Sequence, residues 1–167
     1  QSWYKDLSKD LTIMLNGQFG YANSYGGKEF PFFKNFYVGG GNSVRGYRQS
    51  SIGPVCLAGD QSCGSASSSM NMLLGGNKQI IANAELFMPV PFIKNNNNQF
   101  RLSAFIDAGN VYGHDESINL STMRYSAGMG VLWVSPFGPL KLVYAVPFNN
   151  QSTDRTESFQ FQMGQQF

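Results

Sequence analysis

The sequence carries little charge. Only 13% of its 167 residues are Asp, Glu, Lys or Arg, which is about half the share usual in a soluble domain. The net charge of +2 is too small to indicate nucleic acid as a partner. The mean hydropathy is nevertheless -0.23, so the missing charge is not replaced by uniformly apolar sequence. This balance is typical of segments in which apolar residues alternate with small polar ones.

Long apolar runs are also missing. No stretch approaches the roughly 18 apolar residues of a transmembrane helix. The first residues lack the basic start and apolar block of a signal peptide. That absence is expected of an exported chain that has lost its leader, or of a piece from the end of a longer chain.

Residues for catalysis or metal binding are scarce. The chain has two cysteines and one histidine, His114, in a polar stretch, too few for a four-ligand metal site. The glycine-rich residues 39–46 lack the Gly-Lys-Ser/Thr ending of a phosphate-binding loop. We therefore predict no enzyme, no cofactor and no metal. Cys56 and Cys63 share one Ser/Gly-rich stretch, which predicts a disulfide in an oxidising compartment and two free thiols in the cytosol.

Alternation with a period of two dominates what is present, and it is the signature of β-strands. In residues 100–112, for example, Leu102 and Ile106 share one face while Ser103 and Asp107 share the other. The polar faces consist mainly of Ser, Gln, Asn and Gly, which suit a wet lumen, and a strand of about ten residues spans a tilted bilayer. The sequence therefore predicts an all-β fold, an antiparallel meander of six strands from a transmembrane β-barrel. The expected strands cover residues 11–21, 79–88, 100–112, 124–135, 140–148 and 158–167.

The connections alternate between tight and long. Residues 135–139 form a Pro-Gly turn, residues 113–123 and 149–157 are longer and polar, and residues 22–78 are far longer than an ordinary loop. Short turns on one side and long loops on the other are typical of bacterial outer-membrane barrels. We therefore expect the tight turn in the periplasm and residues 22–78 as an extracellular loop that folds toward the lumen. A loop of this length in a compact domain is usually functional. A soluble β-barrel that binds a small ligand remains an alternative class.

One cation in this loop has a specific expected partner. Arg45 lies among glycines, which allow a compact loop tip, and its guanidinium offers a rigid fork of donors that suits a carboxylate. Two carboxylates, Glu85 and Asp107, lie on the polar faces of consecutive expected strands. An inward-folding loop would bring Arg45 to both. The alternative is a solvated loop cation and two charges that line a wet channel.

The loop carries a motif with a known resemblance. Val44, Arg45, Gly46 and Tyr47 resemble the Val-Arg-Gly-aromatic motif of the outer-membrane superfamily that contains barrel-assembly insertases and two-partner-secretion transporters. The chain is most similar to the C-terminal part of the transmembrane barrel of the insertases, in register along nearly its whole length. Further similar stretches are residues 26–32, 36–40, 52–54, 85–89, 107–111, 135–140, 145–148 and 159–167.

The resemblance implies both a fold and a function. It implies an intact barrel of about sixteen strands, periplasmic POTRA domains outside residues 1–167, and a Gram-negative bacterial outer-membrane location. The implied function is the assembly and insertion of β-barrel proteins as part of an assembly complex, with no covalent chemistry. A secretion pore of the two-partner type is the alternative.

The implied partners are nascent outer-membrane proteins, accessory lipoproteins bound mainly through the POTRA domains, and outer-membrane lipid. A client strand would pair at a weak seam formed by the terminal strand, which carries Phe159, Phe161 and Phe167. A narrow apolar belt near the seam would thin the bilayer. In the isolated fragment the strands at residues 11–21 and 158–167 would both have bare edges, and we expect it to form a homo-oligomer by edge-to-edge pairing.

Overall fold

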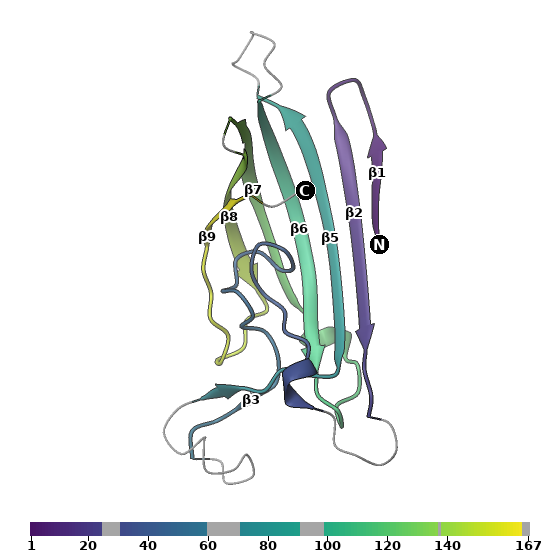
Figure 1. Cartoon of the computed structure of the whole chain (residues 1–167), viewed down its shortest axis with the longest axis vertical. Coiled ribbons are helices and arrows are strands. Elements are labelled where there is room, and N and C mark those ends of the chain that lie inside the picture. The colour runs from purple at the N-terminus through teal and green to yellow at the C-terminus, as the bar shows by residue number, and fades with distance from the viewer. Residues whose placement is uncertain (25–30, 60–70, 91–98, 137, 165–167) are drawn as a thin grey trace.

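The computed structural model describes residues 1–24, 31–59, 71–90, 99–136 and 138–164. In these ranges nearly all regular structure is antiparallel sheet (Figure 1). The helical segments η1 (Phe32–Lys34) and η4 (Leu120–Thr122) are single 3-10 turns. No helix in the described part of the chain is long and apolar enough to cross a membrane.

One sheet of seven strands forms the wall of the molecule, in the order β1-β2-β5-β6-β7-β8-β9. Each strand follows the last as a meander, except that the loop between β2 and β5 contains the two-residue strands β3 (Val55–Cys56) and β4 (Met72–Leu73). The wall strands are β1 (Ser2–Asp6), β2 (Thr12–Tyr21), β5 (Lys78–Pro89), β6 (Phe100–Tyr112), β7 (Arg124–Ser135), β8 (Gly138–Phe148) and β9 (Phe159–Met163).

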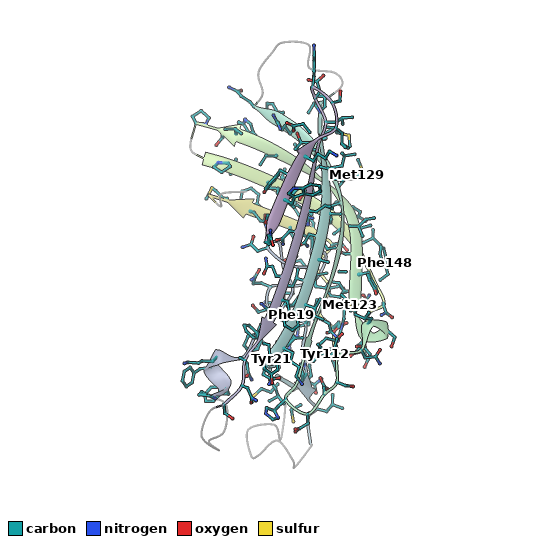
Figure 2. The ribbon with its side chains drawn as sticks, turned by 90° about the vertical axis from the view of Figure 1, so that its right-hand side faces the viewer. Phe19, Tyr21, Tyr112, Met123, Met129 and Phe148 are labelled. Carbon is teal, nitrogen blue, oxygen red and sulfur yellow. The ribbon has the colours of Figure 1, made fainter. Side chains whose placement is uncertain are left out.

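The outer face of this sheet is apolar and exposed. Figure 2 shows Phe19, Tyr21, Met129 and Phe148 projecting from the ribbon, and their exposed fractions are 68%, 58%, 60% and 44%. The same face carries Ile106, which is 61% exposed. A soluble sheet would bury such residues, because removing apolar area from water is the main stabilising term in folding. Exposure over a whole sheet face is instead the pattern of a wall that faces lipid.

The inner face is polar and mostly buried. The long loop lies against it (Figure 1), and the antiparallel register places Asn83 opposite Asp107 and Glu85 opposite Phe105. Glu85 and Asp107 are 2% and 0% exposed. The strands therefore bury charge on the inside and expose hydrocarbon on the outside, the reverse of a soluble protein.

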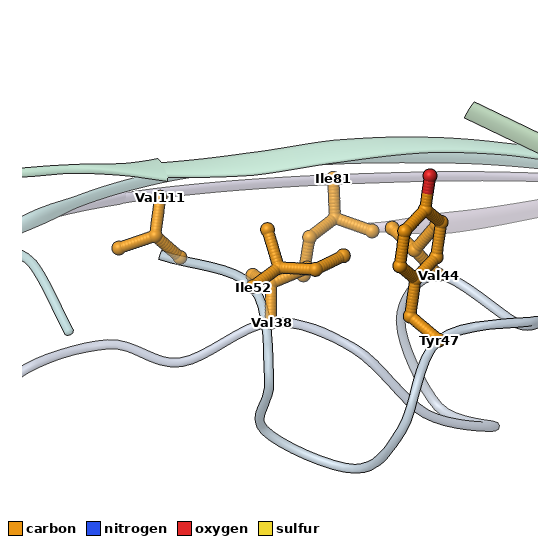
Figure 3. Packing of buried hydrophobic residues seen from close by; sticks show 6 residues of the cluster. All are labelled: Val38, Val44, Tyr47, Ile52, Ile81 and Val111. Carbon is orange, nitrogen blue, oxygen red and sulfur yellow. The ribbon is translucent and has the colours of Figure 1, made fainter. Parts of the chain in front are cut away.

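A small apolar core joins the loop to the wall. Three loop side chains, Val38, Val44 and Ile52, point toward the sheet, where Ile81 and Val111 meet them (Figure 3). Each of the three is 0% exposed, and Tyr47 closes the cluster at one end. Complete burial of one such side chain contributes about 1.5–3 kcal/mol. The loop is thus packed against the inner face.

The predicted meander of six strands is confirmed in outline, and the sheet contains one strand more. Residues 2–6 form β1, which pairs with β2 from Ser2↔Asn16 to Asp6↔Thr12. The prediction that the strand at residues 11–21 has a bare edge is therefore wrong. All five residues of β1 are exposed. Neither face of this strand is buried, so its short sequence does not show the alternation of apolar and polar residues that predicted the other strands. The last strand ends at Met163 rather than at 167, and residues 165–167 lie outside the described residues.

Candidate functional site

The site is centred on Arg45, which the loop carries into the interior. Val44 and Tyr47, on either side of it in the chain, are held in the apolar core. Gly46 adopts a φ of +86°, which is costly for residues with a side chain. A Cβ on Gly46 would also lie 3.1 Å from the Cβ of Ala145 on β8. Glycine therefore allows the loop backbone to turn directly against the wall while Arg45 points along it.

Asp107 on β6 receives most of the hydrogen bonds from this arginine. The Nε and Nη2 atoms of Arg45 donate to the two carboxylate oxygens, each over 2.7 Å, in the bidentate geometry that guanidinium and carboxylate favour. The backbone N–H of Arg45 donates a third bond over 3.0 Å. Asn83 of β5 adds a fourth over 2.9 Å and also donates to the Ser43 carbonyl oxygen. A fully buried carboxylate is thus well satisfied.

Glu85 on β5 binds the other side of the guanidinium. Its Oε2 atom accepts from Nη1 of Arg45 over 2.7 Å. The ammonium of Lys141, on β8, lies 2.8 Å from Oε1 and 3.1 Å from Oε2 of the same carboxylate. Two cations and two anions therefore form one neutral, buried group. Neutrality matters here because an uncompensated buried charge is strongly destabilising.

An aromatic ring supports the guanidinium from one face. The Cζ atom of Arg45 lies 3.5 Å from the centroid of the Phe105 ring, and Phe105 is 3% exposed. Stacking of this kind adds a cation–π attraction that grows when water is excluded. Burial by itself lowers the pKa of Arg45, but the hydrogen bonds and charges of Asp107 and Glu85 outweigh it and raise that pKa. The guanidinium is therefore charged throughout the physiological range.

The sequence predicted the contacts of Arg45 with two carboxylates, but not the other two residues of this group. The contacts expected of Arg45 with Glu85 and Asp107 are both present. Lys141 and Phe105 were not singled out. A signal for Lys141 existed, because it shares a strand face with Val143 and Ala145, opposite Leu142 and Tyr144. This places its charge on the inner face, where Glu85 and Asp107 also lie. The signal for Phe105 was weaker: it is an aromatic residue on the strand face that also carries Ser103 and Asp107, but its contact with the guanidinium depends on the distance between the loop and the wall.

A second buried arginine lies at the end of the sheet opposite the turn between β7 and β8. Arg124, at the start of β7, donates to Asp154 over 3.0 and 2.9 Å. It also donates to Asn110 over 2.6 Å and to Gln151 over 2.9 Å. These bonds tie the connection between β8 and β9 to β6 and β7. The sequence did not indicate this cluster.

The remaining predicted residues are placed as follows. Phe159 and Phe161 lie on the outer face of β9 and are 61% and 56% exposed. Cys56 is buried and disulfide-bonded, not a free thiol. Cys63 and Phe167 lie outside the described residues, so the pairing of Cys56 with Cys63 stays a prediction. Among the residues described, no three His, Cys, Asp or Glu side chains gather as a metal site requires.

These features define a class of protein. The sheet is apolar where it faces outward and charged where it faces inward, and its long loop is anchored to the inner wall by buried ion pairs. This is the construction of a membrane β-barrel with an occupied lumen. The chain is a segment of an outer-membrane β-barrel, and the described strands form an open sheet.

The chain belongs to the Omp85 superfamily, whose domain matches residues 1–167. It is 38% identical to the outer membrane protein assembly factor BamA of Neisseria meningitidis, over the whole of this chain and 23% of that protein. It is 31% identical to the sorting and assembly machinery component 50 homolog B of Xenopus laevis, over 96% of this chain and 37% of that protein.

A solved structure agrees with these sequence comparisons. The crystal structure of BamA from Haemophilus ducreyi lacking POTRA domains 1–3 superposes with a TM-score of 0.82 at 32% identity. The match covers 96% of this chain and 32% of that one. The chain thus spans 23% to 37% of the length of these three chains.

Proposed function

We propose that this chain is the C-terminal barrel segment of an insertase that assembles β-barrel proteins in the bacterial outer membrane. The observation that carries the proposal is the match of nearly the whole chain to the BamA structure, with a TM-score of 0.82 at 32% identity. In the proposed mechanism a client strand pairs at the terminal strand β9, because a strand edge that becomes free recruits other strands. The similarity to proteins named as assembly factors in a bacterium and a frog supports the same function.

In this proposal the parts of the chain have separate roles. Residues 22–78 are an extracellular loop that fills part of the lumen, and the motif from Val44 to Tyr47 anchors it. The terminal strand with Phe159, Phe161 and Phe167 forms one side of the seam at which a client strand pairs. The exposed outer face contacts outer-membrane lipid. Accessory lipoproteins bind mainly to POTRA domains elsewhere in the full-length protein.

A secretion pore of the two-partner type is the second candidate, because the Arg45 motif occurs in both classes. The anchored loop suits either one, since it can regulate a seam or plug a channel. The relatives named above favour the insertase. They are described as assembly factors, whereas a pore would serve the export of one partner.

Reconstitution separates the two candidates. The full-length protein that contains this chain is placed in vesicles, and a urea-unfolded eight-stranded outer-membrane protein is added. Folding is followed by the gel shift between heated and unheated samples. We expect faster folding than in protein-free vesicles. Unchanged client folding together with a large ionic conductance would favour the pore and contradict the insertase.

A further inference from the structure

We propose that Gln160 of β9 is a positioning residue that clamps the terminal strand to the Arg45 loop, so that the ion pairs at Arg45 control how firmly β9 is held. The inference rests on the proposed function for its biological meaning, since β9 is the strand at which a client would pair. The contacts themselves are properties of the chain alone.

The amide of Gln160 contacts the loop backbone with both of its polar atoms. Its Nε2 donates to the carbonyl oxygen of Tyr47 over 2.7 Å, and its Oε1 accepts from the N–H of Gly46 over 3.4 Å. The side chain points inward and Gln160 is 8% exposed. The reversed amide would set donor against donor and acceptor against acceptor, so the surroundings determine its orientation.

Backbone bonds extend the same attachment. Residues 46–48 run beside residues 155–157, which lead into β9. The N–H of Glu157 donates to the Gly46 carbonyl oxygen over 2.8 Å, and the N–H of Arg48 donates to the Arg155 carbonyl oxygen over 2.8 Å. Tyr47 and Thr156 form an antiparallel bridge between these bonds. The loop therefore acts as a short extra strand for the segment before β9.

The phenol of Tyr47 reaches the other end of the same connection. Its oxygen lies 3.0 Å from the carbonyl oxygen of Phe148, the last residue of β8, and 2.7 Å from Oδ1 of Asn150. Burial, the largest cause, raises the pKa of Tyr47, so the hydroxyl remains a donor at physiological pH. The loop thus holds both ends of the segment between β8 and β9.

Arg45, the residue before Gly46, attaches the same loop to β5 and β6. Arg45 binds Glu85 of β5 and Asp107 of β6, whereas Gly46, one peptide bond away, binds β9 through Gln160. Strands β7 and β8 separate these two attachments in the sheet. The loop is therefore a brace across the inner face, and displacement of Arg45 moves the groups that hold β9.

Such a brace matters most for β9. This strand pairs with β8 over five residues, whereas β7 and β8 pair over eleven. Short terminal strands exchange and open more readily than long central ones. The hydrogen bonds from the loop therefore add to the few that hold β9 against β8, and their loss should open β9 before the longer strands β5 to β8.

Hydrogen exchange of the full-length protein in lipid nanodiscs tests the clamp. Gln160→Met removes both polar contacts at similar length. Gln162→Met is the matched control, because Gln162 lies on the same inner face of β9 and its side chain packs beside Gly41 of the loop rather than beside Gly46 and Tyr47. We expect amides of residues 155–163 to exchange about ten-fold faster in Gln160→Met, the effect of losing one or two net hydrogen bonds. The control should leave them within about two-fold of the wild type.

Arg45→Ala provides the decisive comparison. Within the part of the chain that the structure describes, the hydrogen bonds of Arg45 go to Asp107 and Glu85 and none goes to β9. Arg45→Ala should nevertheless speed exchange in β9 as much as Gln160→Met does. The double variant should add little. Wild-type exchange in residues 159–163 of Arg45→Ala would overturn the proposal, as would equal exchange in the two glutamine variants.

If Gln160→Met does not fold, Gln160→Glu replaces it, since it keeps the acceptor for Gly46 and loses the donor to Tyr47. No client is present in these measurements. Failure of the clamp is therefore distinguishable from failure of the insertase proposal, which is read from client folding.

Discussion

The pair of Arg45 and Asp107 should contribute several kcal/mol to the stability of the intact barrel. An exposed ion pair contributes about 0–1 kcal/mol, whereas removal of one partner of a buried pair costs about 3–5 kcal/mol. The side chains of Arg45 and Asp107 are 4% and 0% exposed, so the larger range applies. Arg45→Ala leaves a buried carboxylate without its main donors, and Asp107→Ala leaves the guanidinium with Glu85 alone.

A double-mutant cycle in the full-length protein measures this coupling. The free energy of unfolding is obtained from urea titrations in lipid vesicles, followed by tryptophan fluorescence and by the gel shift on heating. We expect each single variant to lose about 3–5 kcal/mol. The double variant should lose at least about 2 kcal/mol less than the sum of the two, because each single variant carries the cost of a buried unpaired charge.

Arg48→Ala is the matched control for the cycle. Arg48 lies three residues further along the same loop and is exposed, so its removal should change the unfolding free energy by no more than about 0.5 kcal/mol. If the losses for Arg45 and Asp107 add to within about 0.5 kcal/mol, the two residues are not coupled. That result would refute the buried ion pair as the anchor of the loop.

Three further outcomes are expected. Lys141→Met should lower the unfolding free energy by about 1–3 kcal/mol, because the buried carboxylate of Glu85 loses one partner. An unchanged value in the same titration would show that the cluster does not need its fourth charge. Gly128→Ala should lower the unfolding free energy by about 1–3 kcal/mol, since a Cβ there would overlap β8 and the Phe105 ring. Gly17→Ala is its control and should leave that free energy unchanged, because a Cβ at Gly17 meets nothing within 4 Å. Cys56 and Cys63 should resist thiol labelling in non-reduced exported protein, and replacing both with serine should remove about 2–3 kcal/mol of mostly local stability while barrel assembly, read by the gel shift, continues.

The alternation of apolar and polar residues along the chain was enough to predict most strands of the sheet. A strand has a period of two, so a line of residues such as Ser103, Phe105 and Asp107 is assigned to one face without any coordinates. Pairing of consecutive strands then brings Glu85 and Asp107 near each other. The preference of a guanidinium for carboxylates was enough to predict the partners of Arg45. These inferences succeed because they depend on local geometry and on chemical type.

The tertiary structure alone decided the contacts that depend on how closely the loop approaches the wall. The residues of β1 show no burial pattern, and they form a strand only because β2 offers an edge. Phe105 supports Arg45, and Gln160 binds the backbone of Gly46 and Tyr47. A glutamine on a polar strand face looks the same in the sequence whether it meets water or a loop. Its partner lies 113 residues away. The packing of Val38, Val44 and Ile52 against the sheet, together with the ion pairs of Arg45, brings the two together.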